Sequence, residues 1–210
     1  MPYIPPQNRP PIDAAVEALA ARIADELAAA RATVAVSESY RRAFLAIADG
    51  LAALESGRAA AAGPERAVAS AIFEAAKAYH QPGGWLGELN YAVTRLIQGV
   101  PYAMYKRGVW KEALRYWLYA ETVGALTRTA YDLHARGGND WVLNGLAGVF
   151  EDVKDEYKRR VNTAYEAAQI RKSGDCYELS PFRTQLVPFE TAGAQGWIEI
   201  QLPPREPGAK

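Results

Sequence analysis

Apolar side chains recur at steps of three and four residues along most of the chain, the spacing that places them on one face of an α-helix. The pattern is longest between Asn144 and Tyr177. It predicts a long helix that buries a single stripe and carries charged residues on the rest of its surface. The stripe is expected to contain Leu146, Phe150, Val153, Tyr157, Val161, Ala164 and Ala168.

Two helices are predicted in the first quarter of the chain. Because residues 1–12 are rich in proline, we expect them to run extended over the surface, with Ile4 docked on the protein. Asp13 is then expected to cap a first helix that continues to about Arg31. A second helix is expected to start from a cap at Ser37 or Ser39 and to end at Gly57.

Three more helices are predicted before the long one. The third starts at Pro64, because proline is favoured in the first turn of a helix. The fourth begins near Trp85 and is expected to be interrupted or ended by Gly99 and Pro101. The fifth is predicted over residues 109–135, before Asn139 and Asp140 cap the long helix.

The spacing of apolar residues changes near the C-terminus from a helical to a strand-like pattern. Residues 197–202 alternate between apolar and polar, as a half-buried strand does. Residues 183–189 are expected to pair with them across a turn at 192–196, although Pro188 confines that partner to a sheet edge. The sequence therefore predicts an all-α bundle of five or six helices with a small C-terminal β-hairpin or extended arm. The expected domains are residues 1–178 and 179–210.

Composition narrows the classes of protein considered. The 210 residues include 24 basic and 24 acidic side chains, so no global charge favours nucleic acid or an anionic membrane. No run reaches the roughly 18 apolar residues of a membrane span, and the N-terminus lacks the apolar segment of a secretory signal. The single cysteine, Cys176, fits a reducing compartment, and we expect a cytoplasmic protein.

Four carboxylates are concentrated on the predicted long helix. Their spacing of three and four residues is the one that helical nucleotide pyrophosphohydrolases use for Mg²⁺. Such sites need a second acidic helix, and Glu88 and Glu121 each stand alone on their helices. The simpler interpretation is that these carboxylates form ion pairs with Arg159 and Arg160. The cluster consists of Glu151, Asp152, Asp155 and Glu156.

A polar network between the fourth helix and the long helix is a second candidate site. On the long helix, Lys154 and Arg160 fall close to the apolar stripe and are expected to be partly buried. The network would fix the register of the two helices or hold a small anionic or nucleotide ligand. Its candidate residues are Glu88, Asn90, Arg95, Glu151, Lys154, Glu156 and Arg160.

Aromatic residues alternate with basic ones between Tyr102 and Tyr119, an arrangement that can stack bases. The helical spacing favours a buried centre or a subunit interface instead, because aromatics fall on two faces of the helix. The candidate interface residues are Tyr116, Trp117, Tyr119, Arg159 and Glu166. His80 and His134 are expected at the surface near helix ends, and no metal or cofactor site is predicted.

Three blocks of the sequence are similar to those of a family of small proteins of unknown function from phages, bacteria and archaea. The blocks are MPYIPPQNRPPID, GELNYAVTRLI and the segment 148–177. Lys158, Ala164 and Ala167 depart from the tyrosine, proline and aspartate that the family tends to have at those positions. The resemblance implies a helical fold and carries no established activity.

These observations predict a non-catalytic structural or interaction protein that forms a homo-oligomer. Two alternatives stay open: a Mg²⁺-dependent hydrolase acting on nucleotides, and a protein that binds a small anionic ligand.

Overall fold

The computed structural model describes residues 4–29, 36–59, 62–108, 115–162, 183–191 and 194–202. The chain divides into two units, Met1–Asn162 and Thr163–Lys210. In the described residues, the first unit contains six α-helices and the second a two-stranded antiparallel sheet. The predicted fold class is therefore confirmed. The expected domain boundary after residue 178 lies outside the described residues.

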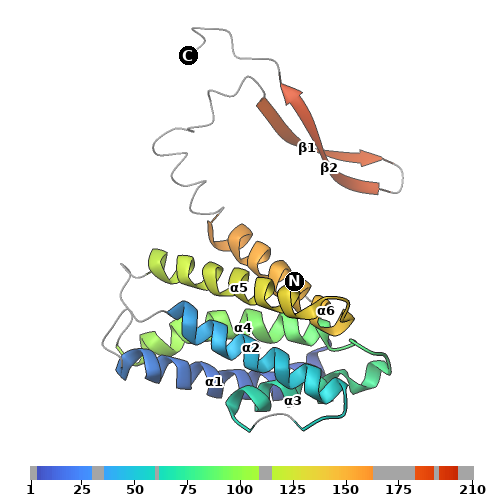
Figure 1. Cartoon of the computed structure of the whole chain (residues 1–210). Helices are drawn as coiled ribbons and strands as arrows, with labels where there is room; N and C mark the ends of the chain where they lie inside the picture. Colours follow the sequence, from blue (N-terminus) through green and yellow to red (C-terminus); the bar gives the residue numbers. More distant parts are fainter. Residues whose placement is uncertain are drawn as a thin grey trace. The chain divides into compact units, whose positions relative to one another are not determined.

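The six helices form three layers of two. Figure 1 shows α5 and α6 along one side of the first unit, α1 and α3 along the opposite side, and α2 and α4 between them. Among the described residues, no helix combines the length and the apolar character that crossing a bilayer requires. The bounds are α1 (Arg9–Ala29), α2 (Val36–Glu55), α3 (Pro64–Ala76), α4 (Leu86–Lys106), α5 (Arg115–Gly137) and α6 (Trp141–Tyr157).

The core lies between these layers and consists of aliphatic and aromatic side chains. Phe44 of α2 stacks on Tyr40 with ring centroids 5.5 Å apart, and it meets Phe150 of α6 at 5.3 Å. Burial of such side chains supplies most of the stability of helices this long, because helix propensity alone is weak. Leu146, Phe150 and Val153 are buried, which confirms the predicted stripe over most of α6, and Tyr157 at its end is partly buried.

The N-terminal segment is helical where an extended chain was expected. A 3₁₀ turn at Pro6–Asn8 leads directly into α1, which begins at Arg9, so Asp13 lies inside the helix and does not cap it. Pro10 and Pro11 fit because the first turn of a helix has no intrahelical partner for their missing N–H groups. The predicted docking of Ile4 is confirmed, since its side chain is buried.

The start of α2 also differs from the prediction. Ser37 and Ser39 lie within the first turn of the helix and are buried, so neither serves as its cap. The backbone N–H of Ser37 donates instead to the carboxylate of Glu121 on α5, at 3.0 Å. A carboxylate at this position satisfies a free N–H group and interacts favourably with the helix dipole.

The fourth helix passes through the predicted break. It runs from Leu86 to Lys106 with Pro101 inside it. An internal proline removes one backbone hydrogen bond, but the helix buries residues before and after it, including Val100 and Ala103. Gly99 also has a packing role, because a Cβ added there would lie 3.2 Å from the Cβ of Ala20 on α1. Tertiary packing therefore holds this sequence in one helix.

The last helix of the first unit is capped as predicted. The Asp140 carboxylate accepts the N–H groups of Val142 at 2.8 Å and Leu143 at 3.4 Å, and α6 begins at Trp141. It ends at Tyr157, and the chain continues as a π-helical segment, Lys158–Asn162. The remainder of the predicted long helix, residues 163–177, lies outside the described residues.

The second unit contains the predicted hairpin. Strand β1 (Arg183–Thr191) pairs antiparallel with β2 (Ala194–Leu202). Pro188 faces Trp197 in the register, and a two-stranded sheet leaves an edge for a residue that has no N–H group.

Candidate functional site

A buried carboxylate ties the N-terminal segment to α4. Glu88 is only 1% exposed, and its Oε1 accepts hydrogen bonds from Asn8 Nδ2 at 3.0 Å and from the hydroxyl of Tyr79 at 2.6 Å. Asn8 Nδ2 also lies 3.1 Å from the carbonyl oxygen of Ala75. The hydrogen bond to Glu88 raises the pKa of Tyr79, because the carboxylate holds the phenolic proton.

A second carboxylate joins α1 to α4 one turn further along. Asp13 accepts hydrogen bonds from the hydroxyl of Tyr91, at 3.0 and 3.1 Å, and from Arg95 Nε at 3.0 Å. Burial, followed by the bond to Asp13, raises the pKa of Tyr91, and the same carboxylate raises the pKa of Arg95. The Arg9 guanidinium lies 5.8 Å from the centre of the Tyr91 ring, within the range of a cation–π interaction.

These contacts form two neighbouring sets along α4, which we together name the N-terminal junction. On α4, its residues follow the helical repeat, so they share the face that packs on α1. The junction consists of Asn8, Arg9, Asp13, Tyr79, Glu88, Tyr91 and Arg95.

The predicted network between α4 and α6 does not form among the described residues. Glu88 and Arg95 bind the N-terminal segment and α1, as above, and make no contact with the charges of α6. The reason is the direction of each side chain around α4. Asn90 is about 200° from Glu88 on the helix, so a residue that faces α6 cannot share its face with one that faces α1.

Asn90 lines a groove between α4 and α6 with a volume of about 660 Å³. Its side chain forms no hydrogen bond with another described residue. Asp152, Asp155 and Arg159 of the α6 side also line the groove, together with Gly148, where an added Cβ would meet no atom within 4 Å. The groove therefore unites one residue of the predicted network with the charged face of α6.

Glu156, at the edge of this groove, is held by two neighbouring arginines. Arg159 donates to it through Nε and Nη2, both at 2.8 Å, and Arg160 donates through Nε. The hydrogen bonds from Arg159 and Arg160 lower the pKa of Glu156 to about 2. A carboxylate with such a pKa is a poor proton acceptor at neutral pH, whether the cluster is interpreted as a Mg²⁺ site or as a set of ion pairs.

The exposed fractions of two side chains, Lys154 and Arg160, test the predicted orientation of α6. The Lys154 side chain is 16% exposed and lies 3.6 Å from Asp155, which confirms its partial burial. The Arg160 side chain is 47% exposed, so its expected burial is wrong. The helix becomes a π-helical segment at Lys158, and the wider π turn changes the direction in which the following residues project. Glu151 is exposed.

The predicted aromatic interface is only partly described. Tyr119 stacks on Tyr157 with ring centroids 5.5 Å apart, and Trp117 packs half-buried against the core. The side chain of Tyr116 and the whole of Glu166 lie outside the described residues. In the described part of the helix, these aromatics therefore join α5 to the end of α6.

A protein-family model matches residues 1–176. The chain belongs to the family described as a domain of unknown function (DUF6899). The match confirms the predicted resemblance to a family of unknown function. No curated protein and no solved structure matches the chain. The DUF6899 region contains both the N-terminal junction and the α4–α6 groove.

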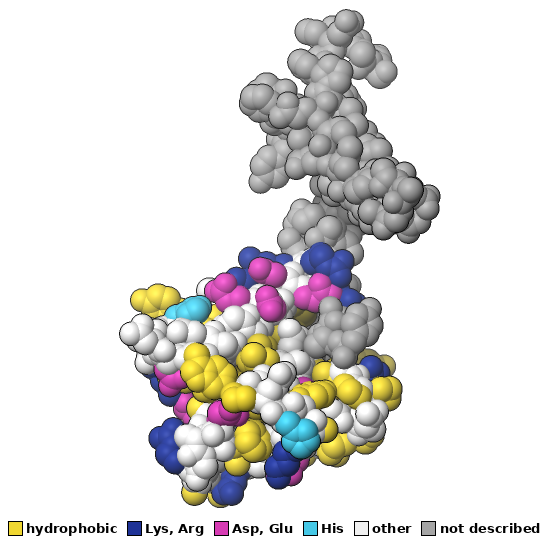
Figure 2. All heavy atoms as spheres, turned by 90° about the vertical axis from the view of Figure 1, so that its right-hand side faces the viewer, with side chains coloured by type: hydrophobic (Ala, Val, Ile, Leu, Met, Phe, Trp, Pro, Cys, Tyr) yellow, Lys and Arg dark blue, Asp and Glu magenta, His cyan; other side chains and the backbone are white. Residues whose placement is uncertain are grey.

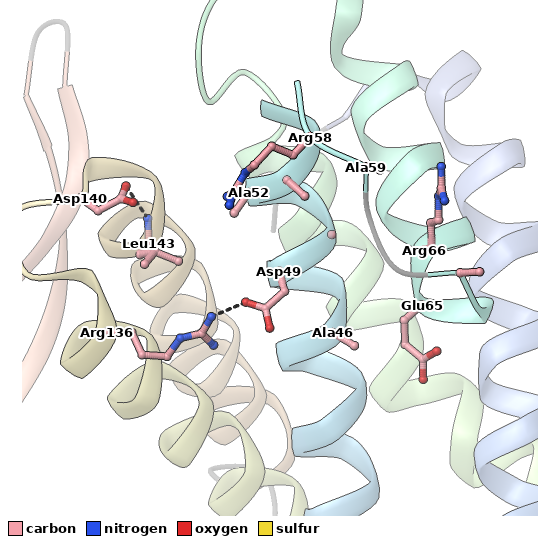
Figure 3. Close-up of a pocket in the computed structure, with 13 residues that line it drawn as sticks. Ala46, Asp49, Ala52, Arg58, Ala59, Glu65, Arg66, Arg136, Asp140 and Leu143 are labelled. Atoms are coloured by element: carbon pink, nitrogen blue, oxygen red, sulfur yellow. Dashed lines mark hydrogen bonds and ion pairs between the residues drawn. The ribbon is translucent and has the colours of Figure 1, made fainter. Parts of the chain in front are cut away.

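A second pocket of the DUF6899 region, of about 520 Å³, lies over α2 between α3 and the α5–α6 turn. Figure 3 shows Arg136 of α5 directed at Asp49 of α2, with which it forms an ion pair. Arg58, which follows α2, and Arg66 of α3 also line the pocket, and Arg58 Nε donates to Ser56 Oγ at 2.7 Å. Three guanidinium groups and an alanine-rich floor could hold a small anion.

The described part of the chain offers no candidate metal centre. No group of three or more His, Cys, Asp or Glu side chains gathers there in a way that could hold an ion. His80 and His134 are exposed near helix ends, which confirms their predicted placement.

Sequence reasoning did not identify four members of the N-terminal junction, Asn8, Arg9, Asp13 and Tyr79, as partners of α4. Asn8, Asp13 and Tyr79 carry no motif that names their partners, and Asn8 lies 80 residues from Glu88. The sequence did contain one indication, because the first two blocks that resemble the family both carry polar residues at helical spacing. Which of these residues contact one another is decided only when the helices pack.

Proposed function

We propose that this DUF6899 protein is a non-catalytic structural or interaction protein of the cytoplasm that assembles as a homo-oligomer. The observation that carries this proposal concerns the polar residues of the blocks MPYIPPQNRPPID and GELNYAVTRLI. These residues pair with one another or with Tyr79 inside the helical unit. Asp13 and Arg95, which also line a pocket of about 390 Å³, pair with each other between α1 and α4. The buried Glu88 is bound by Asn8 and Tyr79. Side chains paired in this way hold the helices together and are less available to act as general acids or bases.

The outer surface supplies the second support. Tyr102, Tyr105 and Trp141 are exposed, each by more than half of its surface. Aromatic side chains at the surface are enriched in protein interfaces, because they bury a large area at a small entropic cost. The nearly neutral sequence also imposes no long-range repulsion between copies.

The assembly is tested by analytical ultracentrifugation over a wide range of protein concentration. We expect a species heavier than the 22.9 kDa monomer that dissociates on dilution. A single sharp monomer at the highest concentration would contradict the proposal.

A small anionic ligand is the second candidate, and the pocket of Arg58, Arg66 and Arg136 favours it. Titration with inorganic phosphate and pyrophosphate by calorimetry tests this role. A binding signal that is lost in Arg58→Ala plus Arg66→Ala would support a ligand-binding protein. Asp49, Glu65 and Asp140 line the same pocket and lower its attraction for anions, which is why we rank this role second.

A magnesium-dependent hydrolase has less support. Such an enzyme needs carboxylates on two facing helices, but Glu88 is buried in the N-terminal junction and Glu156 is bound by Arg159 and Arg160. A thermal shift with Mg²⁺ or Mn²⁺ that disappears in Glu151→Ala plus Glu156→Ala would favour the enzyme. We expect no shift with any divalent ion.

A further inference from the structure

The outward face of α6 carries charges of both signs in a definite order. Glu151, Asp152 and Asp155 come first along the helix, and Lys158 and Arg159 follow. All five side chains are exposed, with Asp155 at 72% and Arg159 at 64%. At about 100° per residue, these three acids of α6 fall within about 100° of one another around the axis, and Lys158 and Arg159 follow in the π-helical turn. We name this surface the α6 charged face.

Several of these charges are not used inside the described structure. Glu151, Asp152 and Lys158 form no hydrogen bond or ion pair with another described residue. Asp155 meets only Lys154, at 3.6 Å, and that contact is long for an ion pair. Figure 2 shows acidic and basic side chains together along the upper edge of the helical unit, the side on which Figure 1 places α5 and α6.

The order of the charges makes the face complementary to itself. A two-fold axis between Asp155 and Lys158 would place Asp155 of one copy opposite Lys158 of the other. It would also place Asp152 and Glu151 opposite residues 161 and 162, which adjoin the basic end of the neighbouring copy. A two-fold interface uses the same patch on both subunits, so the patch must be complementary to itself. A helix with acids at one end and bases at the other is complementary to a second copy that runs antiparallel to it. A partner of one sign would be repelled by half of the face.

The groove beside α6 gives a second copy room to approach. It has a volume of about 660 Å³, and Asp152, Asp155 and Arg159 belong both to its lining and to the charged face. The Asn90 amide, which has no hydrogen-bond partner among the described residues, faces the same groove. An amide can donate to a carboxylate or accept from a basic group, so it fits either end of a second copy.

We propose that the α6 charged face, with the α4–α6 groove, is the contact between two copies of this chain, paired antiparallel about a two-fold axis. This proposal rests on the homo-oligomer proposed above and names the surface that forms it.

Charge reversal tests the pairing. Asp152→Lys plus Asp155→Lys gives a copy whose face is basic except at Glu151, and Lys158→Glu plus Arg159→Glu gives a copy that is acidic along the whole face. Each variant alone repels its own kind, so self-association should weaken roughly tenfold or more relative to the unaltered protein. An equimolar mixture should restore association, because both halves of the contact are then complementary. Sedimentation velocity measures all three samples.

A matched control carries the same change of charge elsewhere. Glu17→Lys plus Glu74→Lys alters two exposed acids on α1 and α3 and should associate as the unaltered protein does. If the unaltered protein is a monomer, the homo-oligomer fails together with this contact. If it associates but the reversed variants associate equally well, or the mixture is not restored, only this surface is wrong. Circular dichroism of each variant distinguishes lost association from lost folding.

Discussion

The N-terminal junction and the α6 charged face are both rich in charged residues, but the fold uses them in opposite ways. Glu88 and Asp13 are bound by residues about 80 positions away in the chain. Asp152 and Lys158 have no such partner in the described part of the chain and lie exposed. A charge inside the protein is costly unless it is paired, whereas an exposed charge costs little and is available to a partner. The density of charged residues in the sequence therefore does not tell whether those charges are paired inside the fold or exposed at its surface.

The largest expected effect is at the centre of the junction. Glu88→Ala empties a site that is only 1% exposed and removes the acceptor shared by Asn8, which is half-buried, and Tyr79, which is partly exposed. We expect the free energy of unfolding to fall by about 2–3 kcal/mol, measured by urea denaturation. Glu88→Gln keeps an acceptor oxygen at this position and should cost about 1 kcal/mol. Equal stability of the alanine variant and the unaltered protein would show that the junction does not hold the N-terminus.

Asp13→Ala should have the next largest effect, because it removes the acceptor of Tyr91 and Arg95. The Asp13 side chain is partly exposed, so water can replace some of the lost bonds, and we expect a loss of about 1–2 kcal/mol. Asp13→Asn is the matched control, since it can still accept from Tyr91 but loses the charge opposite Arg95. A loss as small in the alanine variant as in the asparagine variant would assign the stability to other contacts.

A smaller effect is expected at Glu156, which lies on α6 beside the charged face. Its pKa falls from 4.5 to about 2 because Arg159 and Arg160 donate to the charged carboxylate. The resulting stability is complete above pH 4.5 and is lost as the pH falls toward 2. The ion pair is largely exposed, so the loss should stay below about 1 kcal/mol.

Glu156→Gln tests this pH dependence. Urea unfolding measured across the acidic range should show a shallower decline for the variant than for the unaltered protein. Identical slopes would mean that the ion pair adds nothing to folding.

The smallest effect on stability is expected on the α6 charged face. Asp152→Asn plus Asp155→Asn should change the free energy of unfolding by less than about 0.5 kcal/mol, because both side chains are exposed. The same variant should make self-association less sensitive to salt in sedimentation, since fewer charges meet across the contact. A large loss of stability would show that these acids belong to the fold and not to an interface, and the comparison of the two regions would fail.

Local patterns in the sequence were enough for several elements. The stripe of Leu146, Phe150 and Val153 predicted the buried face of α6, and Asp140 predicted its cap. Pro64 predicted the start of α3, and the alternation in residues 197–202 predicted a strand. These features depend on side-chain period and on capping, which act over a few residues and can be identified without knowing the fold.

Local signals failed where packing outweighed them. Gly99 and Pro101 indicated a break, but the packing of α4 on α1 keeps the helix continuous. Ser37 and Ser39 indicated a cap, yet Glu121 of another helix binds the N-terminus of α2. Burial of a helix face can outweigh an unfavourable helix propensity of about 1 kcal/mol. A side chain that is distant in the sequence can also accept a hydrogen bond from a helix N-terminus as well as a local cap does.

The sequence by itself determined that the chain is helical, where α3 and α6 begin, and which residues carry charge. The tertiary structure decided which charges are paired inside and which remain on the surface. Glu88 and Glu151 are the same residue type on amphipathic helices, yet the first is buried under Asn8 and Tyr79 and the second faces solvent. The physical reason is that burial and pairing depend on the neighbours that packing supplies, and helical period specifies only the face.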